Sequence, residues 1–176
     1  MDPSESAASQ DLKILIIYYS FEGSTRLVAE AMASAAGADL LPITPQKEMS
    51  SRGFSKYFWG SSQVMMKRKP KLQPFPLNPR EYDLIFIGTP VWAWTFSPPV
   101  GTLLNEIDFG TKKTALFCCH GGQKGKTIEH MKEKLAHSQV MGETDFIEPV
   151  KKNTESAVEK AQAWALEMVH LATEIS

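Results

Sequence analysis

The chain has 176 residues and a formal net charge of -1, and these values exclude several classes of protein. A chain of this length fits one domain with its own apolar core and leaves little room for a second. The balanced charge favours neither nucleic acid nor an anionic membrane surface as a partner. No apolar run approaches the roughly 20 residues that a membrane-spanning helix needs.

The two cysteines, Cys118 and Cys119, are adjacent and lie in an apolar stretch. Adjacent cysteines rarely pair without backbone distortion, so we expect no disulfide framework. Residues 1–10 carry acidic and small residues without the apolar block of a signal peptide, which predicts a disordered N-terminal lead. These features together predict a protein of the reducing cytoplasm.

Apolar runs typical of strands buried on both faces alternate with helical patterns along the chain. Leu12–Tyr19 predicts the first strand, and Ser24–Ala36 predicts a helix that stops at Gly37. Leu40–Thr44 predicts a shorter second strand. The pattern continues with a strand at Asp83–Gly88, a helix opened by Ser97, Pro98 and Pro99, a strand at Thr114–Cys119, a helix at Lys126–Ala136, a strand around Asp145–Ile147 with an irregular start near Gly142, and a last helix capped by Asn153.

This alternation predicts βαβ units and an α/β three-layer sandwich around a parallel sheet. Residues 11–176 are expected to form a single domain with a long insert at residues 45–80. The insert contains a candidate helix at Phe54–Met66 and then a proline-rich extended loop. It either packs its aromatic residues onto the domain or has a function, and its basic cluster at Lys67–Lys71 is either a solvated surface or a docking site for an acidic partner or a nicotinamide phosphate.

In open parallel sheets, ligands bind beyond the carboxyl ends of the strands, where the strand order reverses. The loop after the first strand reads Ser20-Phe21-Glu22-Gly23-Ser24-Thr25. Gly23 permits a tight turn that points amides inward, and the next helix directs its positive end at the same place. Ser20, Ser24 and Thr25 add hydroxyl groups. The loop therefore predicts a site for a terminal phosphate monoester, and the alternative is an ordinary helix N-cap.

The loop after the third strand, Gly88–Phe96, contains three large aromatic residues. Such residues are costly to leave in water, so we expect a flat ring to stack on Trp92 or Trp94. The alternative is that they cover the sheet edge or a dimer contact. The loop after the fourth strand, His120–Gly125, is rich in glycine, which allows the backbone to approach a flat heterocycle, and the alternative is a flexible turn.

Several other residues have two interpretations. His120 is either a proton donor near a ligand or a solvated loop residue. Cys118 and Cys119 are expected to pack as small apolar residues, with a redox role for Cys119 as the lesser alternative. His130, His137 and His170 have no metal-like spacing.

From Lys13 to Ile175 the chain resembles the flavodoxins and related FMN-binding oxidoreductases, through the segments Tyr19–Thr25, Gly88–Trp92 and Phe117–Gly122. The resemblance implies a five-stranded parallel sheet in the order 2-1-3-4-5 and FMN as the cofactor, with no side chain needed as a catalytic group. It implies that Ser20, Phe21, Glu22, Gly23, Ser24 and Thr25 hold the phosphate, that Thr89, Pro90, Val91, Trp92, Ala93 and Trp94 carry one face of the isoalloxazine, and that Cys119, His120, Gly121, Gly122 and Gly125 line its pyrimidine edge.

The chain departs from the family pattern at two places. Glu22 replaces the usual hydroxyl residue, and the loop after the fourth strand lacks the tyrosine that covers the second flavin face. That face is therefore expected to be open, or covered by the insert at residues 45–80. We therefore expect an FMN-binding electron-transfer protein or small oxidoreductase, with an NAD(P)H-dependent quinone-type reductase as one alternative and a non-redox phosphate-binding module as another. The expected partners are a redox protein, or NAD(P)H with a small acceptor, for a monomer or homodimer.

Overall fold

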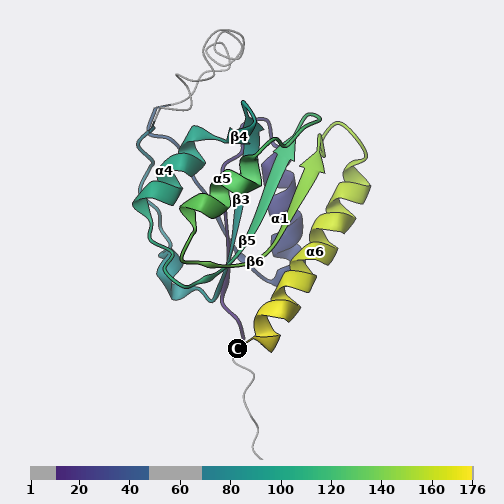
Figure 1. Ribbon diagram of the computed structural model, residues 1–176. Helices are drawn as coiled ribbons and strands as arrows, with labels where there is room; N and C mark the ends of the chain where they lie inside the picture. Colours follow the sequence, from purple (N-terminus) through teal and green to yellow (C-terminus); the bar gives the residue numbers. More distant parts are fainter. Residues whose placement is uncertain (1–10, 48–68, 176) are drawn as a thin grey trace, which may run out of the picture.

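The computed structural model describes residues 11–47 and 69–175, which form a three-layer α/β sandwich (Figure 1). The parallel strands are β1 (Ile14–Tyr18), β2 (Asp39–Pro42), β3 (Leu84–Trp92), β5 (Lys113–His120) and β6 (Gln139–Ile147). They lie in the order β2-β1-β3-β5-β6. Because β5 and β6 are the fourth and fifth parallel strands along the chain, this confirms the predicted order 2-1-3-4-5. A short strand, β4 (Thr95–Phe96), pairs antiparallel with β3 and was not predicted.

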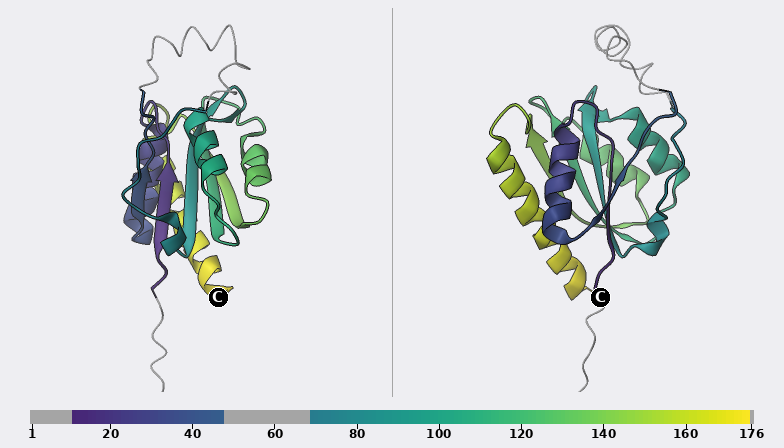
Figure 2. Two further views of the ribbon diagram at one scale, coloured as in Figure 1. Left: turned by 90° about the vertical axis from the view of Figure 1, so that its left-hand side faces the viewer. Right: turned by 180° about the vertical axis from the view of Figure 1, so that it is seen from behind.

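Two pairs of helices cover the two faces of the sheet (Figure 2). Helices α1 (Ser24–Ala36) and α6 (Thr154–Glu174) pack on one face, and α4 (Pro98–Glu106) and α5 (Thr127–Lys134) pack on the other. Successive side chains of a strand point to opposite faces, so each buried strand supplies both cores. In β1, Ile16 packs toward α1 and α6, while Ile17 packs toward the other pair of helices.

The helix boundaries follow the predicted capping residues. Gly37, with a φ of 65°, ends α1 and donates its N–H to the carbonyl of Ala33 at 2.9 Å. Asn153 opens α6, and its side chain accepts a hydrogen bond from the N–H of Ser156 at 3.4 Å. Both residues have left-handed backbones, which glycine and asparagine adopt more readily than other residues.

Three strands are longer than predicted: β5 by one residue at each end, and β3 and β6 by more. Strand β3 continues past Gly88 because Val91 pairs with Phe96, and Trp92 pairs with Thr95. Strand β6 begins at Gln139, and its pairing with β5 shifts register between Thr114 and Ala115, near the predicted irregularity at Gly142. Gly142 has little room beside α6, since a Cβ atom there would lie 2.5 Å from the sulfur of Met168.

The described part of residues 45–80 crosses the domain as an extended segment. Pro45 forms an isolated antiparallel bridge with Leu72, whose side chain is buried in the core beneath α4 and α5. A short 3-10 helix, η1 (Pro79–Glu81), precedes β3. The helix predicted at Phe54–Met66 and the lead at residues 1–10 lie outside the described residues. Within residues 11–47 and 69–175, no helix is long and apolar enough to cross a membrane.

Candidate functional site

The carboxyl ends of β1, β3, β5 and β6 meet at one edge of the sheet, where they enclose an open groove of about 230 Å³. This is the edge at which parallel sheets bind ligands. The predicted site residues that line the groove are Ser20, Phe21, Glu22, Ser24, Thr25, Pro90, Val91, Trp92, Cys119, His120 and Gly121. The predicted residues that do not line it are Gly23, Thr89, Ala93, Trp94, Gly122 and Gly125.

The loop after β1 makes a sharp turn into α1. Gly23 is the N-cap residue, and its φ of 93° lies in a region that side chains disfavour. No side chain caps the helix from the N-cap position. Ser20 instead accepts a hydrogen bond from the N–H of Arg26 at 3.2 Å, which fixes the loop against the helix. The amides of Ser24 and Thr25 belong to the first turn, whose N–H groups have no acceptor within the helix.

The hydroxyl of Thr25 is the clearest sign of a ligand in the groove. The residue is 1% exposed, and its Oγ1 atom is buried with no nitrogen or oxygen partner among the described residues. Only the thiol of Cys119, which is a weak hydrogen-bond partner, interacts with this hydroxyl. Buried polar atoms almost always have a partner, so one without a nitrogen or oxygen partner beside a groove indicates a group that is absent from the protein chain itself. The only other such atom in the described residues is Oγ1 of Thr114, near the opposite end of β5.

Glu22 is the one carboxylate in this loop. Its side chain is exposed at the rim of the groove, and the first turn of α1 contains no acidic residue. The interior of the loop therefore presents amides and hydroxyls, which suits a phosphate, while Glu22 adds an unfavourable charge at the rim.

The two tryptophans after β3 have different environments. Trp92 is 7% exposed and packs edge-on against Tyr19 and Phe21, with ring centroids 5.9 and 5.7 Å away. Trp94 is 64% exposed at the tip of the β3–β4 hairpin, where both Ala93 and Trp94 have positive φ. The strained tip holds an indole out in solvent, so Trp94 is the residue with a free ring surface.

Thr89 supports the hairpin from within the protein. Its Oγ1 atom accepts the N–H of Ser97 at 3.0 Å and lies 3.2 Å from Oγ of Ser97. Both residues are fully buried. The structure therefore places Thr89 beneath the site, where it ties the end of β3 to the start of α4.

The glycines after β5 differ from one another. Gly125 has a φ of 55°, and a Cβ atom there would lie 2.5 Å from Cβ of Trp94, so this glycine is required by the hairpin. The N–H of Lys126 also donates to the carbonyl of Trp94 at 3.1 Å. Gly121 and Gly122 have open space around them, and Gly121 lines the groove.

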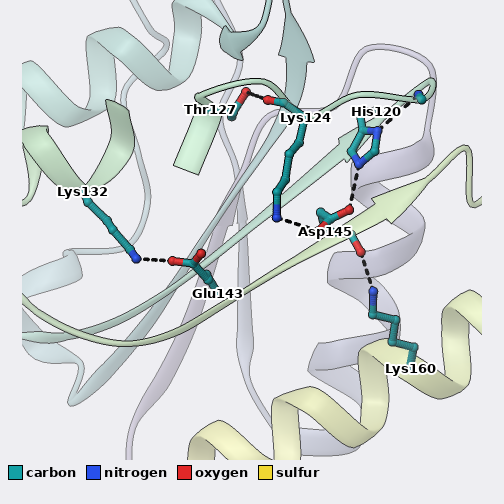
Figure 3. A network of polar contacts seen from close by, with 8 residues as sticks. His120, Lys124, Thr127, Lys132, Glu143, Asp145 and Lys160 are labelled. Atoms are coloured by element: carbon teal, nitrogen blue, oxygen red, sulfur yellow. Dashed lines mark hydrogen bonds and ion pairs between the residues drawn. The ribbon is translucent and has the colours of Figure 1, made fainter. Parts of the chain in front are cut away.

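A polar network joins this loop to β6 (Figure 3). The N–H of Gly122 donates to Nδ1 of His120 at 3.2 Å, so Nε2 carries the proton that His120 shares with Asp145 at 2.8 Å. Lys124 reaches the other carboxylate oxygen of Asp145 at 3.1 Å, and Lys160 of α6 donates to its backbone carbonyl at 2.6 Å. Desolvation by burial opposes the ionisation of Asp145, but the hydrogen bonds from His120 and Lys124 outweigh it and lower its pKa. His120 is 8% exposed, so the solvated-loop interpretation is wrong.

The cysteines pack in opposite cores. Cys118 is buried with α4 and α5, and Cys119 is buried with α1 and α6 at the base of the groove. Burial raises the pKa of the Cys118 thiol to about 12 and also raises that of Cys119 well above its ordinary value. Neither is set up as a thiolate nucleophile. Within the described ranges, no group of three or more histidine, cysteine, aspartate or glutamate side chains is arranged to bind a metal ion.

The groove contains two residues that the sequence analysis missed, Glu148 and Lys151. Both lie in the connection between β6 and α6, which carries no glycine or aromatic signal. The carboxyl-edge rule applies to every parallel strand, so the loop after the last strand was the available signal. A second cavity, of about 300 Å³, is lined by residues such as Arg80, Phe109 and Lys112 near the amino ends of β3 and β5, away from this edge.

The fold and groove define an α/β protein of the doubly wound, parallel-sheet class, with an open groove at the carboxyl edge of its sheet. A family model described as flavodoxin matches residues 13–165, so the chain belongs to the flavodoxin family. None of the curated proteins compared with the chain matches it in sequence.

Solved structures resemble the chain over most of its length. A putative flavoprotein from Bacteroides eggerthii has a TM-score of 0.73 at 23% identity, covering 89% of this chain and 98% of its own. A flavoprotein from Lactobacillus acidophilus, solved in complex with FMN, has a TM-score of 0.66 at 27% identity, covering 80% and 97%. A flavodoxin described as WrbA-like, from Agrobacterium tumefaciens, has a TM-score of 0.58 at 15% identity, covering 93% and 98%.

Proposed function

We propose that this chain binds FMN in the groove, with the phosphate in the Ser20–Thr25 loop. The observation that carries the proposal is the buried hydroxyl of Thr25, which has only the weak thiol of Cys119 as a partner in the described residues and lies beside the amides of the first turn of α1. The flavoprotein from Lactobacillus acidophilus, which was solved with FMN, supports the same cofactor. The donor set fits a phosphate monoester, because neutral amides and hydroxyls at a helix N-terminus favour an anion.

The residues of the chain divide the work of binding. Ser20 fixes the turn, Ser24 and Thr25 offer amides and hydroxyls to the phosphate, and Val91 and Trp92 provide apolar surface in the groove. Trp94 offers an exposed indole on which a flat ring can stack. FMN, when bound, supplies transfer of one or two electrons, so no side chain has to act as an acid or base.

The first experiment is the visible spectrum of the purified protein, followed by flavin fluorescence quenching with FMN, FAD and riboflavin. We expect FMN to bind most tightly, because the loop suits a terminal phosphate. Riboflavin has no phosphate, and in FAD the corresponding phosphate is linked to a second phosphate and is not terminal. An absence of flavin binding would contradict the proposal. Equal or tighter binding of FAD would contradict the assignment of the phosphate loop.

We further propose that the protein is an electron-transfer protein or a small oxidoreductase. One observation favours direct reduction by NAD(P)H: the loop Gly121–Lys126 is exposed and contains no aromatic residue to cover a second flavin face. A nicotinamide ring must reach that face to transfer hydride, for delivery to a small acceptor such as a quinone. The overall charge of -1 also differs from the strongly acidic surface expected of a carrier that docks on basic partners.

Stopped-flow mixing of the anaerobic, FMN-loaded protein with NADPH or NADH separates these roles. Bleaching of the flavin band within minutes, without a second protein, indicates a reductase. A band that stays unchanged indicates a carrier that needs a protein partner. The non-redox alternative predicts binding of inorganic phosphate and simple phosphate esters with no preference for a flavin, and the exposed Trp94 weighs against it.

A further inference from the structure

The connection between β6 and α6 is held at the edge of the groove by backbone contacts. Glu148 has a φ of 41°, and its N–H donates to the carbonyl of His120 at 2.9 Å. The N–H groups of Lys151 and Lys152 both donate back to the carbonyl of Glu148, at 2.9 and 2.8 Å. This tight turn fixes where each side chain of the connection leaves the backbone.

The charges in this turn are not equivalent. Lys152 forms an ion pair with Glu148 at 2.6 Å, and its hydrogen bond lowers the pKa of Glu148. Glu148 is therefore ionised, and its charge is compensated by Lys152. Lys151 lines the groove, and its ammonium group forms no ion pair within 4 Å in the described part of the chain, although its charge also helps to lower the pKa of Glu148. Lys151 is thus the cation that remains available to a ligand.

Lys151 lies across the groove from the phosphate loop. Helices α1 and α6 run side by side and begin at the same end of the molecule, so the turn before α6 stands next to the turn before α1 (Figure 2). Ser24, Thr25 and Lys151 line the same groove, and the buried hydroxyl of Thr25, which has no nitrogen or oxygen partner in the described residues, indicates a ligand there. Glu22 and Glu148 line it as well, so of the described aspartate, glutamate, lysine and arginine residues that line the groove, Lys151 alone offers a positive charge to a dianionic phosphate.

We propose that Lys151 is a specificity-determining residue whose ammonium group pairs with the terminal phosphate of the flavin. This inference rests on the proposed binding of FMN in the groove. It implies that the chain separates FMN from unphosphorylated riboflavin by charge as well as by hydrogen bonds from the α1 loop. It also implies that the affinity for FMN falls as salt is added, because part of it comes from an exposed ion pair.

The test compares three variants by fluorescence quenching with FMN and with riboflavin, at low and at moderate salt. Lys151→Met should weaken FMN binding by roughly 5- to 30-fold, as expected for loss of a charge-assisted hydrogen bond at an exposed site. Riboflavin binding should change by less than about 2-fold, because riboflavin has no phosphate. Lys151→Arg keeps the charge and should bind FMN nearly as well as the wild type.

Lys112→Met is the matched control, because it removes the same charge near the amino end of β5, beside the other cavity. It should leave both affinities unchanged. Inorganic phosphate should compete with FMN less effectively in Lys151→Met than in the wild type. Thermal melts of the apoproteins should coincide, since Lys151 is exposed.

The outcomes separate this inference from the proposed function. If the wild type binds FMN and Lys151→Met binds it equally well, or loses FMN and riboflavin binding alike, the role of Lys151 is wrong and the flavin site stands. If the wild type binds neither flavin, the proposed function fails and the role of Lys151 fails with it.

Discussion

The loop after β1 and the loops after β3 and β5 carry similar sequence signals, but the structure explains them differently. In the loop after β1, Ser24 and Thr25 line the groove, their amides have no acceptor within the helix, and the hydroxyl of Thr25 has only the weak thiol of Cys119 beside it. In the later loops, contacts within the protein account for most of the unusual residues. Thr89 is hydrogen-bonded to Ser97, and His120 to Asp145, while Gly125 leaves room for Trp94. Glycines and hydroxyls at the edge of a sheet therefore indicate a ligand only where their own chain leaves them unsatisfied.

The largest expected effect tests whether Gly125 serves the hairpin. Gly125→Ala would place a methyl group against Trp94 at a positive φ, and it should lower the free energy of unfolding of the apoprotein by about 2–3 kcal/mol. Gly121→Ala is the control, since a Cβ atom there meets nothing within 4 Å. Urea denaturation without flavin measures both. Equal stability of the two variants would show that the glycine at position 125 is not required by packing.

The polar network on β6 should contribute to stability in a pH-dependent way. Asp145→Asn removes the carboxylate that accepts from His120 and Lys124, and we expect a loss of about 1–2 kcal/mol at neutral pH, reduced from the fully buried value by partial exposure. The pKa of Asp145 is lowered in the folded protein, so this stability is present above its unfolded-state pKa and is lost as the pH falls through the folded-state pKa.

Denaturation curves at several pH values check this sign. The difference in the free energy of unfolding between the wild type and Asp145→Asn should have its full value at pH 7 and should shrink as the pH drops below about 4. Glu143→Gln is the control on the same strand, because its partner Lys132 is at the surface and the pair should contribute less than about 1 kcal/mol (Figure 3). A difference that grows in acid would contradict the assignment.

The third prediction concerns the two tryptophans. Trp94→Ala should weaken FMN binding by about 1–1.5 kcal/mol and leave the stability of the apoprotein nearly unchanged, because the indole is exposed. Trp92→Phe should keep FMN affinity within about 2-fold, since Trp92 mainly packs against Tyr19 and Phe21. Fluorescence quenching and the flavin spectrum distinguish the two. Unchanged affinity in Trp94→Ala would remove Trp94 from the stacking surface.

The smallest expected effect is the most specific to the phosphate loop. Thr25→Val removes a buried hydroxyl whose only partner in the described residues is the weak thiol of Cys119, so the apoprotein should become slightly more stable, by up to about 1 kcal/mol, while FMN binding weakens by a similar amount. Thr89→Val should instead destabilise the apoprotein, because its hydroxyl is bonded to Ser97. Loss of stability in Thr25→Val would mean that its hydroxyl has a stronger partner in the protein.

The sequence by itself determined the order of the strands and helices along the chain, because buried parallel strands and amphipathic helices have periodicities that neighbouring residues reveal. It also located the loop that we propose for the phosphate, since a glycine turn between a buried strand and a helix is a local signal. The limits of α1 and the cap at Asn153 came from the same kind of local chemistry.

The tertiary structure alone decided which of these residues face the groove. Trp92 and Trp94 are the same residue type two positions apart, so the sequence does not distinguish them. The pairing of β3 with β4 buries Trp92 and exposes Trp94. His120 and Asp145 are 25 positions apart, and only the β5–β6 register brings them together. Lys151 gives no local signal at all, and it reaches the site because α6 packs along α1 and their preceding turns meet at one edge of the sheet.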